Sequence, residues 1–402
     1  MLRYMNKVGF ICLFSFFYVG MSLFHCAFGH YFYPSVATLD LNSGLEEKEN
    51  VNNMVVLSDK RVALVFAHKH IKVLDFSEAD CQPSVITLSQ GTEANQIKTL
   101  MPLNNQQLVS GFADGTITVL DLSKPGQEQC VATLKGHSDW VVAVIPLSDG
   151  RLASASVDKT LKVWDLSRPV GEKCVATLRH DEWVAAVRQL PDGRLASIST
   201  DGVLKVWNLN NPRGERCLAT LTTDAVSELK SLLLPLTRGR VVTCFSVKVV
   251  NIWDLSEPYP EKPMATLIVS ENESLKTLTE LADGRLVSCA ANGVKVWDLN
   301  KPDGKQCVTT LNEHTGLVRS VVQMPNGWLA SCSEDGTIKL WNLKKSYEKQ
   351  WMGTLDHDGT TSGSLVALPN NRLVFLSHEG VVEVWDLNKL VHRNLFGRCI
   401  LF

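Results

Sequence analysis

The stretch Val163-Trp164-Asp165-Leu166 decides the fold, because close variants of it end a segment of this chain eight times. Each variant has an aliphatic residue, then Trp or Leu, then Asp or Asn, then Leu or Phe. The third position falls at Asp75, Asp121, Asp165, Asn208, Asp254, Asp298, Asn342 and Asp386, in steps of 43 to 46 residues. A period of this size, sustained along the chain, indicates a repeat architecture.

Each repeat also opens with a short run of β-prone residues whose third member is Thr, as in Val131-Ala132-Thr133-Leu134. Two more apolar runs follow, such as Trp140 to Leu147 and Arg151 to Ser156 in the third repeat. Asp-Gly or Asn-Gly pairs separate many of the runs, and such pairs favour hairpin turns. The pattern predicts four short antiparallel strands in each repeat.

Four-stranded units repeated around a ring form a β-propeller, so we expect an all-β, closed propeller over residues 36–387. The segment from Gly136-His137 to Trp164-Asp165 resembles the repeat of the WD-repeat proteins, and the resemblance extends over roughly 350 positions. Eight openings and eight closings of the repeat indicate eight blades. The resemblance implies that Val36 to Leu39 complete the last blade beside the strand that ends at Trp385. Seven blades is the alternative, since the first repeat has Leu74 in place of Trp.

The resemblance also implies a buried hydrogen-bond chain of His, Ser or Thr, Asp and Trp in each complete repeat. Three repeats carry such a set: His137, Ser156, Asp158 and Trp164; His180, Ser199, Asp201 and Trp207; His314, Ser333, Asp335 and Trp341. The hydroxyl could equally come from Ser154, Ser197 or Ser331. We interpret these side chains as structural rather than catalytic, because the chain leaves no buried polar group without a partner.

The other repeats depart from this pattern. The eighth has His357, Ser377 and Trp385 but Glu379 in place of Asp, and the sixth has Asn292 and no His. The fifth lacks both the His and the Asp. We expect the fifth and sixth blades to be held by apolar packing alone.

Five residues are candidates for binding a partner at the rim. Trp140 and Trp183 each stand three residues after a His of the pattern, and aromatic anchors of this kind dominate protein interfaces. Shielding of the buried His is the alternative role. Lys98, Lys276 and Arg319 share one register two residues further on and could favour an acidic or phosphorylated peptide; solvated rim charges are the alternative.

The net charge and the motifs of the sequence argue against nucleic-acid binding and against catalysis. The net charge of −2 argues against nucleic acid, which a concentrated basic face would bind. The sequence has no Gly-rich phosphate loop, no HExxH, no GxSxG and no CxxC, so we expect no catalytic residue, metal or cofactor. We interpret the chain as a monomeric, non-enzymatic scaffold for a protein or peptide ligand.

Three alternatives remain open: a hydrolase-like enzyme at the central channel, a structural factor in an envelope complex, and a substrate adaptor of a ubiquitin ligase. The adaptor motif, a cation two places after the Asp, is matched only in part. Asp165 is followed by Leu166-Ser167, and Asn342 by Leu343-Lys344.

The N-terminus predicts a targeting segment over residues 1–29. Arg3 and Lys7 precede an apolar run from Val8 to Phe28, which is long enough to cross a bilayer as a helix. A membrane anchor and a cleaved signal peptide are both consistent with it, and a buried core strand or a true start at Met21 are alternatives. Residues 30–35 would be a short linker, and the basic flank places the propeller on the non-cytosolic side.

The cysteines favour the opposite location. Four of them, Cys130, Cys174, Cys217 and Cys307, occupy one repeated position, where equivalent residues lie too far apart for disulfides. Free thiols suit a reducing compartment. The last four residues, Cys399 to Phe402, fit a prenylation box, although residues 388–402 could simply form a tail or strand on the last blade. A cytosolic location, including the cytosol of a host cell, is therefore the alternative.

Overall fold

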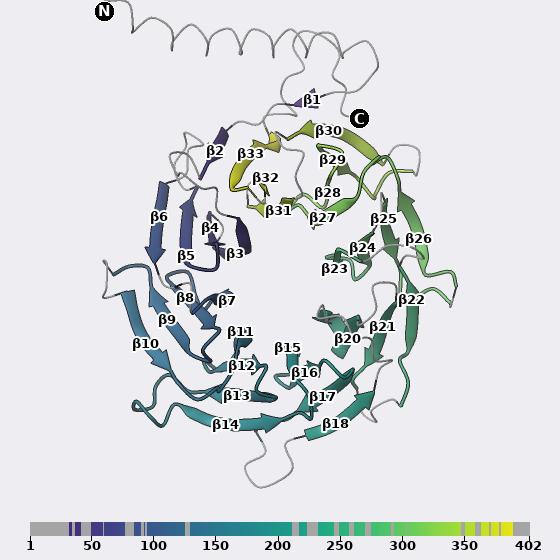
Figure 1. Ribbon diagram of the computed structural model, residues 1–402. Helices are drawn as coiled ribbons and strands as arrows, with labels where there is room; N and C mark the ends of the chain where they lie inside the picture. The colour runs from purple at the N-terminus through teal and green to yellow at the C-terminus, as the bar shows by residue number, and fades with distance from the viewer. Residues whose placement is uncertain are drawn as a thin grey trace, which may run out of the picture.

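The computed structural model is a closed ring of eight antiparallel sheets around an open centre (Figure 1). Eight blades are thus confirmed and the seven-bladed alternative is wrong. The structure describes residues 32–33, 37–41, 50–58, 60–76, 84–89, 92, 95–124, 129–210, 217–222, 232–244, 249–256, 261–269, 275–290, 293–302, 304–346, 350–357, 363–369, 371–377 and 379–388. The predictions for residues 1–29, for Asn292, for Cys399 and for the tail after residue 388 lie outside these ranges.

In each blade the strands lie side by side, with the first strand at the central channel and each later strand further out (Figure 1). Blade 1 holds β3 (Val51–Ser58), β4 (Arg61–Phe66), β5 (His70–Asp75) and β6 (Ser84–Ser89). Blade 2 holds β7 (Ile97–Pro102), β8 (Gln107–Phe112), β9 (Ile117–Asp121) and β10 (Cys130–Leu134). Blade 3 holds β11 (Val141–Pro146), β12 (Leu152–Ser156), β13 (Thr160–Trp164) and β14 (Cys174–Arg179). Blade 4 holds β15 (Val184–Gln189), β16 (Leu195–Ser199), β17 (Val203–Trp207) and β18 (Cys217–Thr222).

The second half of the ring follows the same plan. Blade 5 holds β19 (Leu232–Pro235), the 3₁₀ turn η3 (Thr237–Gly239), β20 (Arg240–Cys244), β21 (Val249–Asp254) and β22 (Ala265–Ile268). Blade 6 holds β23 (Thr277–Glu280), β24 (Leu286–Ala290), β25 (Gly293–Trp297) and β26 (Cys307–Leu311). Blade 7 holds β27 (Val318–Gln323), β28 (Leu329–Ser333), β29 (Thr337–Trp341) and β30 (Trp351–Asp356). Blade 8 holds β31 (Gly363–Leu368), β32 (Arg372–Ser377) and β33 (Val381–Asp386).

The Asp-Gly pairs form the turns that the sequence predicts. Gly150, between β11 and β12, has a φ of 85°, and Gly115, between β8 and β9, has a φ of 83°. These positive values lie in a region that glycine enters without steric cost. The hairpins therefore close tightly on both faces of the disc.

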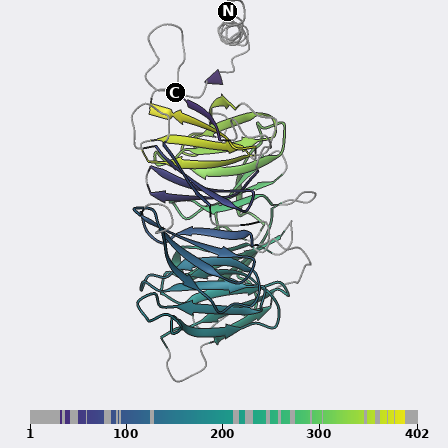
Figure 2. The ribbon, with the colours of Figure 1, turned by 60° about the vertical axis from the view of Figure 1, so that its left-hand side comes forward.

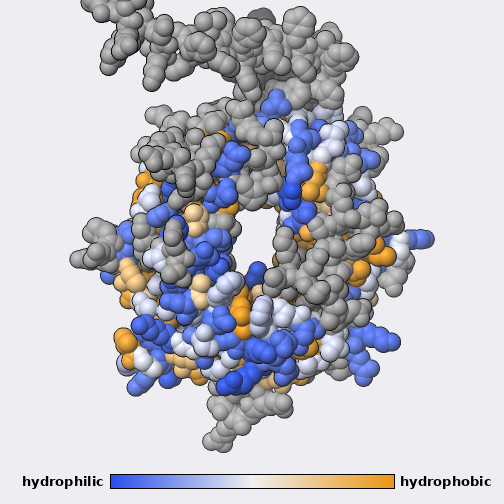
Figure 3. Space-filling model, viewed as in Figure 1, coloured by the Kyte–Doolittle hydropathy of each residue, from blue (hydrophilic) through white to orange (hydrophobic). Residues whose placement is uncertain are grey.

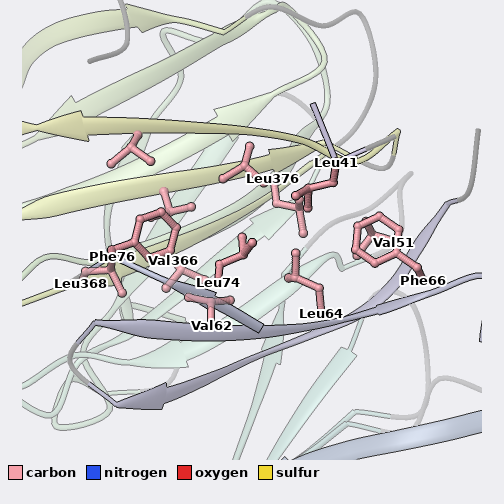
Figure 4. Close-up of a cluster of buried hydrophobic side chains, with 13 residues drawn as sticks. Leu41, Val51, Val62, Leu64, Phe66, Leu74, Phe76, Val366, Leu368 and Leu376 are labelled. Atoms are coloured by element: carbon pink, nitrogen blue, oxygen red, sulfur yellow. The ribbon is translucent and has the colours of Figure 1, made fainter. Parts of the chain in front are cut away.

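The first strand of the propeller closes the ring. As expected, β2 (Ala37–Asp40) pairs antiparallel with β33 and supplies the outermost strand of blade 8. The backbone N–H of Leu41 continues the pairing with a 3.0 Å hydrogen bond to the carbonyl of Gly380. A buried apolar cluster then joins blades 8 and 1, with Leu41, Leu74 and Leu376 among its members (Figure 4). Leu74 thus fills the place that Trp takes in most other repeats.

The Trp of the repeated closing phrase packs against the preceding blade. Trp164, Trp207, Trp253, Trp297, Trp341 and Trp385 are all buried, with 0–5% of each side chain exposed. Trp207 of blade 4, for example, lies in one cluster with Leu161 and Val163 of blade 3. The phrase recurs once per blade because each blade needs a large apolar side chain at this interface.

One further strand falls within the segment expected to be a linker. Residues Phe32–Tyr33 form β1, which pairs in parallel with β30 on the outer edge of blade 7. The turned view shows β1 outside the ring, next to the blades formed by the end of the chain (Figure 2). These two residues lie within the stretch 30–35 that we expect to be a short linker before the propeller. Within the described part of the chain, no helix has the length and apolar character that crossing a bilayer requires.

Candidate functional site

The predicted polar chain exists in blade 3, with one hydroxyl exchanged. The imidazole of His137 donates from Nδ1 to Asp158 Oδ2 at 2.7 Å, and its Nε2 accepts from Ser154 Oγ at 2.7 Å. The indole Nε1–H of Trp164 donates to the same Ser154 hydroxyl at 2.8 Å. Burial alone would raise the pKa of Asp158, but hydrogen bonds from His137 and Thr160 outweigh it and hold the pKa well below its ordinary value. The ionised carboxylate therefore fixes the imidazole.

Ser156, the other hydroxyl that the sequence offers for this position, hydrogen-bonds the backbone instead. It lies at the end of β12, where its hydroxyl donates to the carbonyl of Asp139 and accepts from the backbone N–H of Asp158, both at 3.0 Å. Ser154 is paired with Lys162 of the neighbouring strand β13. Trp164 lies two residues further along β13, on the same face, so its indole reaches the Ser154 hydroxyl. Of the two hydroxyls that the sequence left open, Ser154 rather than Ser156 joins His137 and Trp164.

Blade 7 repeats the arrangement of blade 3. His314 bonds Asp335 at 2.9 Å and Ser331 at 2.8 Å, and Trp341 donates to Ser331 at 2.8 Å. Ser333 accepts from the backbone of Asp335 instead, so Ser331 replaces Ser333 in the chain.

Blade 4 inserts an extra hydroxyl into the chain. Ser199 donates to Asp201 Oδ1 at 2.6 Å and contacts His180 Nδ1 at 3.0 Å, so it stands between the imidazole and the carboxylate. Ser197, not Ser199, accepts from Trp207 at 2.7 Å. Burial lowers the pKa of His180 to about 4, and the charge of Lys205 acts in the same direction. His180 is therefore a neutral core residue near pH 7.

Blades 5 and 6 are not held by apolar packing alone, contrary to expectation. Trp253 Nε1–H donates to Thr243 Oγ1 at 2.9 Å, and Trp297 Nε1–H donates to Ser288 Oγ at 2.8 Å. The missed signal is a Ser or Thr nine or ten residues before the Trp, which every repeat from the third to the seventh contains. These blades keep the Trp–hydroxyl half of the chain.

Blade 8 replaces the hydroxyl by an aromatic ring. His357 stacks on Phe375 with ring centroids 4.2 Å apart, where the other His residues meet a Ser. Ser377 accepts from the backbone N–H of Val381. In every blade with the pattern, the His side chain thus faces the interior. Among the described residues, no group of three or more His, Cys, Asp or Glu side chains is placed to hold a metal ion.

The central channel is open at the centre of the ring (Figure 3). Trp140 and Trp183 stand where the chain enters the innermost strands of blades 3 and 4, which line this channel. Each precedes the innermost strand of its blade, and their carbonyls accept equivalent hydrogen bonds, from Val157 at 3.0 Å and Thr200 at 2.9 Å. Trp140 is 47% exposed and Trp183 is 43% exposed. Two large rings on adjacent blades therefore keep nearly half of their surface in water.

The three rim cations do not act as one group. Lys98 Nζ lies 4.0 Å above the ring of Trp140 and donates to Gln96 Oε1 at 2.9 Å. The guanidinium of Arg319 is paired with Glu334 of its own blade. Lys276 directly precedes β23 of blade 6, and its backbone N–H donates to the carbonyl of Cys289 at 2.9 Å. Lys98 and Arg319 thus contact groups of this chain rather than standing free for a ligand, and an acidic ligand stays a prediction.

The residues two places after the Asp serve local turns. Asp165 Oδ1 accepts from both the backbone and the hydroxyl of Ser167, at 3.0 and 2.6 Å. Asn342 Oδ1 accepts from the backbone of Lys344 at 3.0 Å. The adaptor hypothesis gains no support from this geometry.

A known family model matches this sequence at the three repeats that carry a complete set of His, Ser, Asp and Trp. Residues 128–165, 172–208 and 305–342 match the family model of the WD domain, G-beta repeat. Each match covers the outermost strand of one blade and the three inner strands of the next, which are those of blades 3, 4 and 7. Three WD40 repeats and a closed ring of eight four-stranded blades together give the fold of a WD40-repeat β-propeller. No curated protein matches the chain.

Solved structures show the same fold at low identity. The WD40 beta propeller domain of Doa1 is 19% identical, with a TM-score of 0.51 over 87% of this chain and 95% of that one. The C-terminal WD40 domain of Sif2 is 13% identical, with a TM-score of 0.66 over 87% and 97%. A chain of the Mitotic Checkpoint Complex is 17% identical, with a TM-score of 0.55 over 77% and 94%.

Proposed function

We propose that this chain is a non-enzymatic scaffold that binds a protein or peptide through the channel mouth on blades 3 and 4. The observation that carries the proposal is the pair of half-exposed rings of Trp140 and Trp183 at equivalent positions of adjacent blades. Exposed aromatic rings that lie near one another mark surfaces that a partner covers. We name Trp140, Val142, Trp183 and Ala185 the mouth arc.

Two further points support a scaffold rather than an enzyme. The His and Asp side chains of blades 3, 4 and 7 are engaged in holding strands together and are turned away from the channel. WD40-repeat propellers generally bind proteins, and a chain of similar fold forms part of the Mitotic Checkpoint Complex. An interior polar chain is consistent with a rigid platform that presents its rim.

The experiment replaces both Trp residues by Ala and measures recovery of the proteins that co-purify with the intact chain. The control is Val170→Ala, at a loop residue that is 90% exposed and lies outside the arc. We expect recovery to fall at least about tenfold for the double variant, since aromatic anchors carry much of an interface's energy. Undiminished recovery, with an unchanged melting temperature, would remove this surface from the proposal.

We also propose the location that the N-terminal sequence predicts, with the propeller exported or anchored on the non-cytosolic side of a membrane. Protease protection of the untagged protein in sealed membranes tests it. If the propeller resists the protease until detergent permeabilises the membrane, it lies on the lumenal side, which supports export. A prenylated Cys399 would instead support the cytosolic alternative, because prenylation takes place in the cytosol.

A further inference from the structure

We propose that the ring of Trp183 binds an arginine side chain of the protein partner. This inference rests on the proposed function, since it assigns a ligand chemistry to one residue of the mouth arc. It comes from a comparison of Trp183 with Trp140, the equivalent residue one blade earlier.

Trp140 already holds a cation from its own chain. Lys98 Nζ lies 4.0 Å above the indole ring, within the distance at which the π-electrons attract a positive charge. Gln96 fixes the ammonium with a 2.9 Å hydrogen bond. The position before the innermost strand is therefore one where a Trp ring meets a cation supplied by the preceding blade.

The preceding blade supplies no cation to Trp183. Lys98 is the bulged residue of β7, where the pairing register shifts between Ile97 and Thr99. The bulged residue at the same place in blade 3 is Val142, between Val141 and Ala143. Val142 packs against the cluster that joins blades 3 and 4 and includes Val184, the residue next to Trp183. Val142 therefore stands in the same relation to Trp183 as Lys98 does to Trp140, but it brings no charge to the ring.

The charges beside Trp183 also favour a cationic guest. Asp181 and Glu182 precede it directly, whereas Ser138 and Asp139 precede Trp140. The side chain of Asp181 is 89% exposed, and its one close cation is Lys205 at 3.8 Å. Glu182 shares its charge with Lys159 at 3.2 Å. A guanidinium above the ring could thus reach the Asp181 carboxylate, and arginine suits both contacts because it is planar and always charged.

The test follows the ¹⁵N-labelled indole signals of the intact propeller, with those of Trp140 and Trp183 assigned by Trp→Phe variants. The probes are acetyl-Gly-Arg-Gly-amide and its Leu and Glu counterparts at millimolar concentrations. We expect only the Arg peptide to shift the Trp183 signal in a saturable way. Val142→Lys, which places a lysine in the register of Lys98, should reduce that shift at least about fivefold.

Two matched variants sharpen the result. Lys98→Val uncovers the ring of Trp140, so this signal should begin to respond to the Arg peptide. Asp181→Asn, which keeps the side chain's shape, should weaken the response of Trp183. An equal response to the Leu peptide, or no response to the Arg peptide, would overturn the inference and leave Trp183 as at most an apolar anchor.

The same variants separate this inference from the proposed function. If the Trp140→Ala/Trp183→Ala protein loses its partner while Val142→Lys retains it fully, the arginine inference fails and the scaffold proposal stands. If neither protein loses the partner, both fail. Loss in both, with melting temperatures like that of the parent, supports both.

Discussion

The indole of Trp253 donates a 2.9 Å hydrogen bond to the hydroxyl of Thr243, in a blade that has neither the His nor the turn Asp of its neighbours. Both side chains are buried, at 1% and 0% exposure. The Trp–hydroxyl contact is therefore the part of the polar chain that survives when the rest is lost. It satisfies the one polar group that a buried Trp brings into the interface.

Thr243→Val tests how much this hydrogen bond contributes to stability, because it keeps the shape of the side chain and removes the hydroxyl that accepts from Trp253. We expect the free energy of unfolding to fall by about 1–3 kcal/mol, the usual cost of a buried donor left without a partner. Urea denaturation measures it. Thr222→Val, the same change at an exposed residue of β18, should cost less than about 0.5 kcal/mol. Equal losses in the two variants would contradict the role assigned to Thr243.

Replacement of Ser154 and Ser156 by Ala decides which hydroxyl of blade 3 matters more. Ser154→Ala deprives both Trp164 and His137 of a partner, so we expect a loss of about 2–4 kcal/mol. Ser156→Ala removes two bonds to turn backbone at the strand end and should cost about 1 kcal/mol. Melting curves of the two proteins check the order. The reverse order would contradict the assignment of Ser154 to the set with His137 and Trp164.

The architecture could be predicted because every blade needs the same strands, turns and buried interface residue, so their sequence signals recur once per blade. The period of the Trp-Asp phrase, the hairpin glycines and the early strand beside Trp385 led to eight blades closed by β2. The choice between Ser154 and Ser156 could not, because residues two apart on a strand point to the same face. Only the cross-strand partner of Ser154 brings it to Trp164.

Side-chain contacts between blades, and between a strand and a turn of one blade, could not be predicted from the sequence either. Lys98 and Trp140 were both named for the rim, yet their stacking depends on the angle at which neighbouring blades meet. The pairing of Arg319 with Glu334 depends likewise on how the innermost strand lies against the next turn. The strand β1 has only two residues, too few for any periodic signal.

Acidification should destabilise the protein partly through His180. Burial lowers the pKa of its folded form to about 4, below the ordinary value of 6.5, so the unfolded chain takes up the proton first as the pH falls. Stability from this group is complete above pH 6.5 and declines between pH 6.5 and 4, by up to roughly 3 kcal/mol. His180→Gln removes the titration, so its unfolding midpoint should change less with pH over this range. Parallel pH dependences for the two proteins would refute the assignment.

Ring closure by β2 predicts a sharp limit to N-terminal shortening. A chain that begins at residue 42 lacks β2 and Leu41, which leaves the edge of β33 unpaired and opens the cluster between blades 8 and 1. We expect it to aggregate, or to melt at least about 5 °C below a chain that begins at residue 30. Scanning calorimetry compares them.

A third chain, beginning at residue 35, serves as the control for this comparison. It lacks β1 but keeps β2, and should melt close to the chain that begins at residue 30. If the chain from residue 42 melted with the other two, β2 would have no part in closing the ring.

The seven cysteines within the described residues, all free thiols, should fall into two classes of reactivity. Cys130, Cys174 and Cys307 lie exposed on the outermost strands, each with its thiol near the Thr three residues on. Cys244, Cys289 and Cys332 lie buried on the second strands of blades 5, 6 and 7, where burial raises their pKa to about 11, 11 and 12. Fewer thiolates and less access both slow alkylation.

N-ethylmaleimide labelling, read by peptide mass spectrometry, tests this division. We expect the buried thiols to react at least about 100-fold more slowly than the exposed ones, with the half-buried Cys217 between the classes. Labelling in urea supplies the control, because the difference should vanish when the blades unfold. Rapid reaction of Cys289 or Cys332 in the native protein would show that blades 6 and 7 open locally, against the continuous core that encloses both thiols.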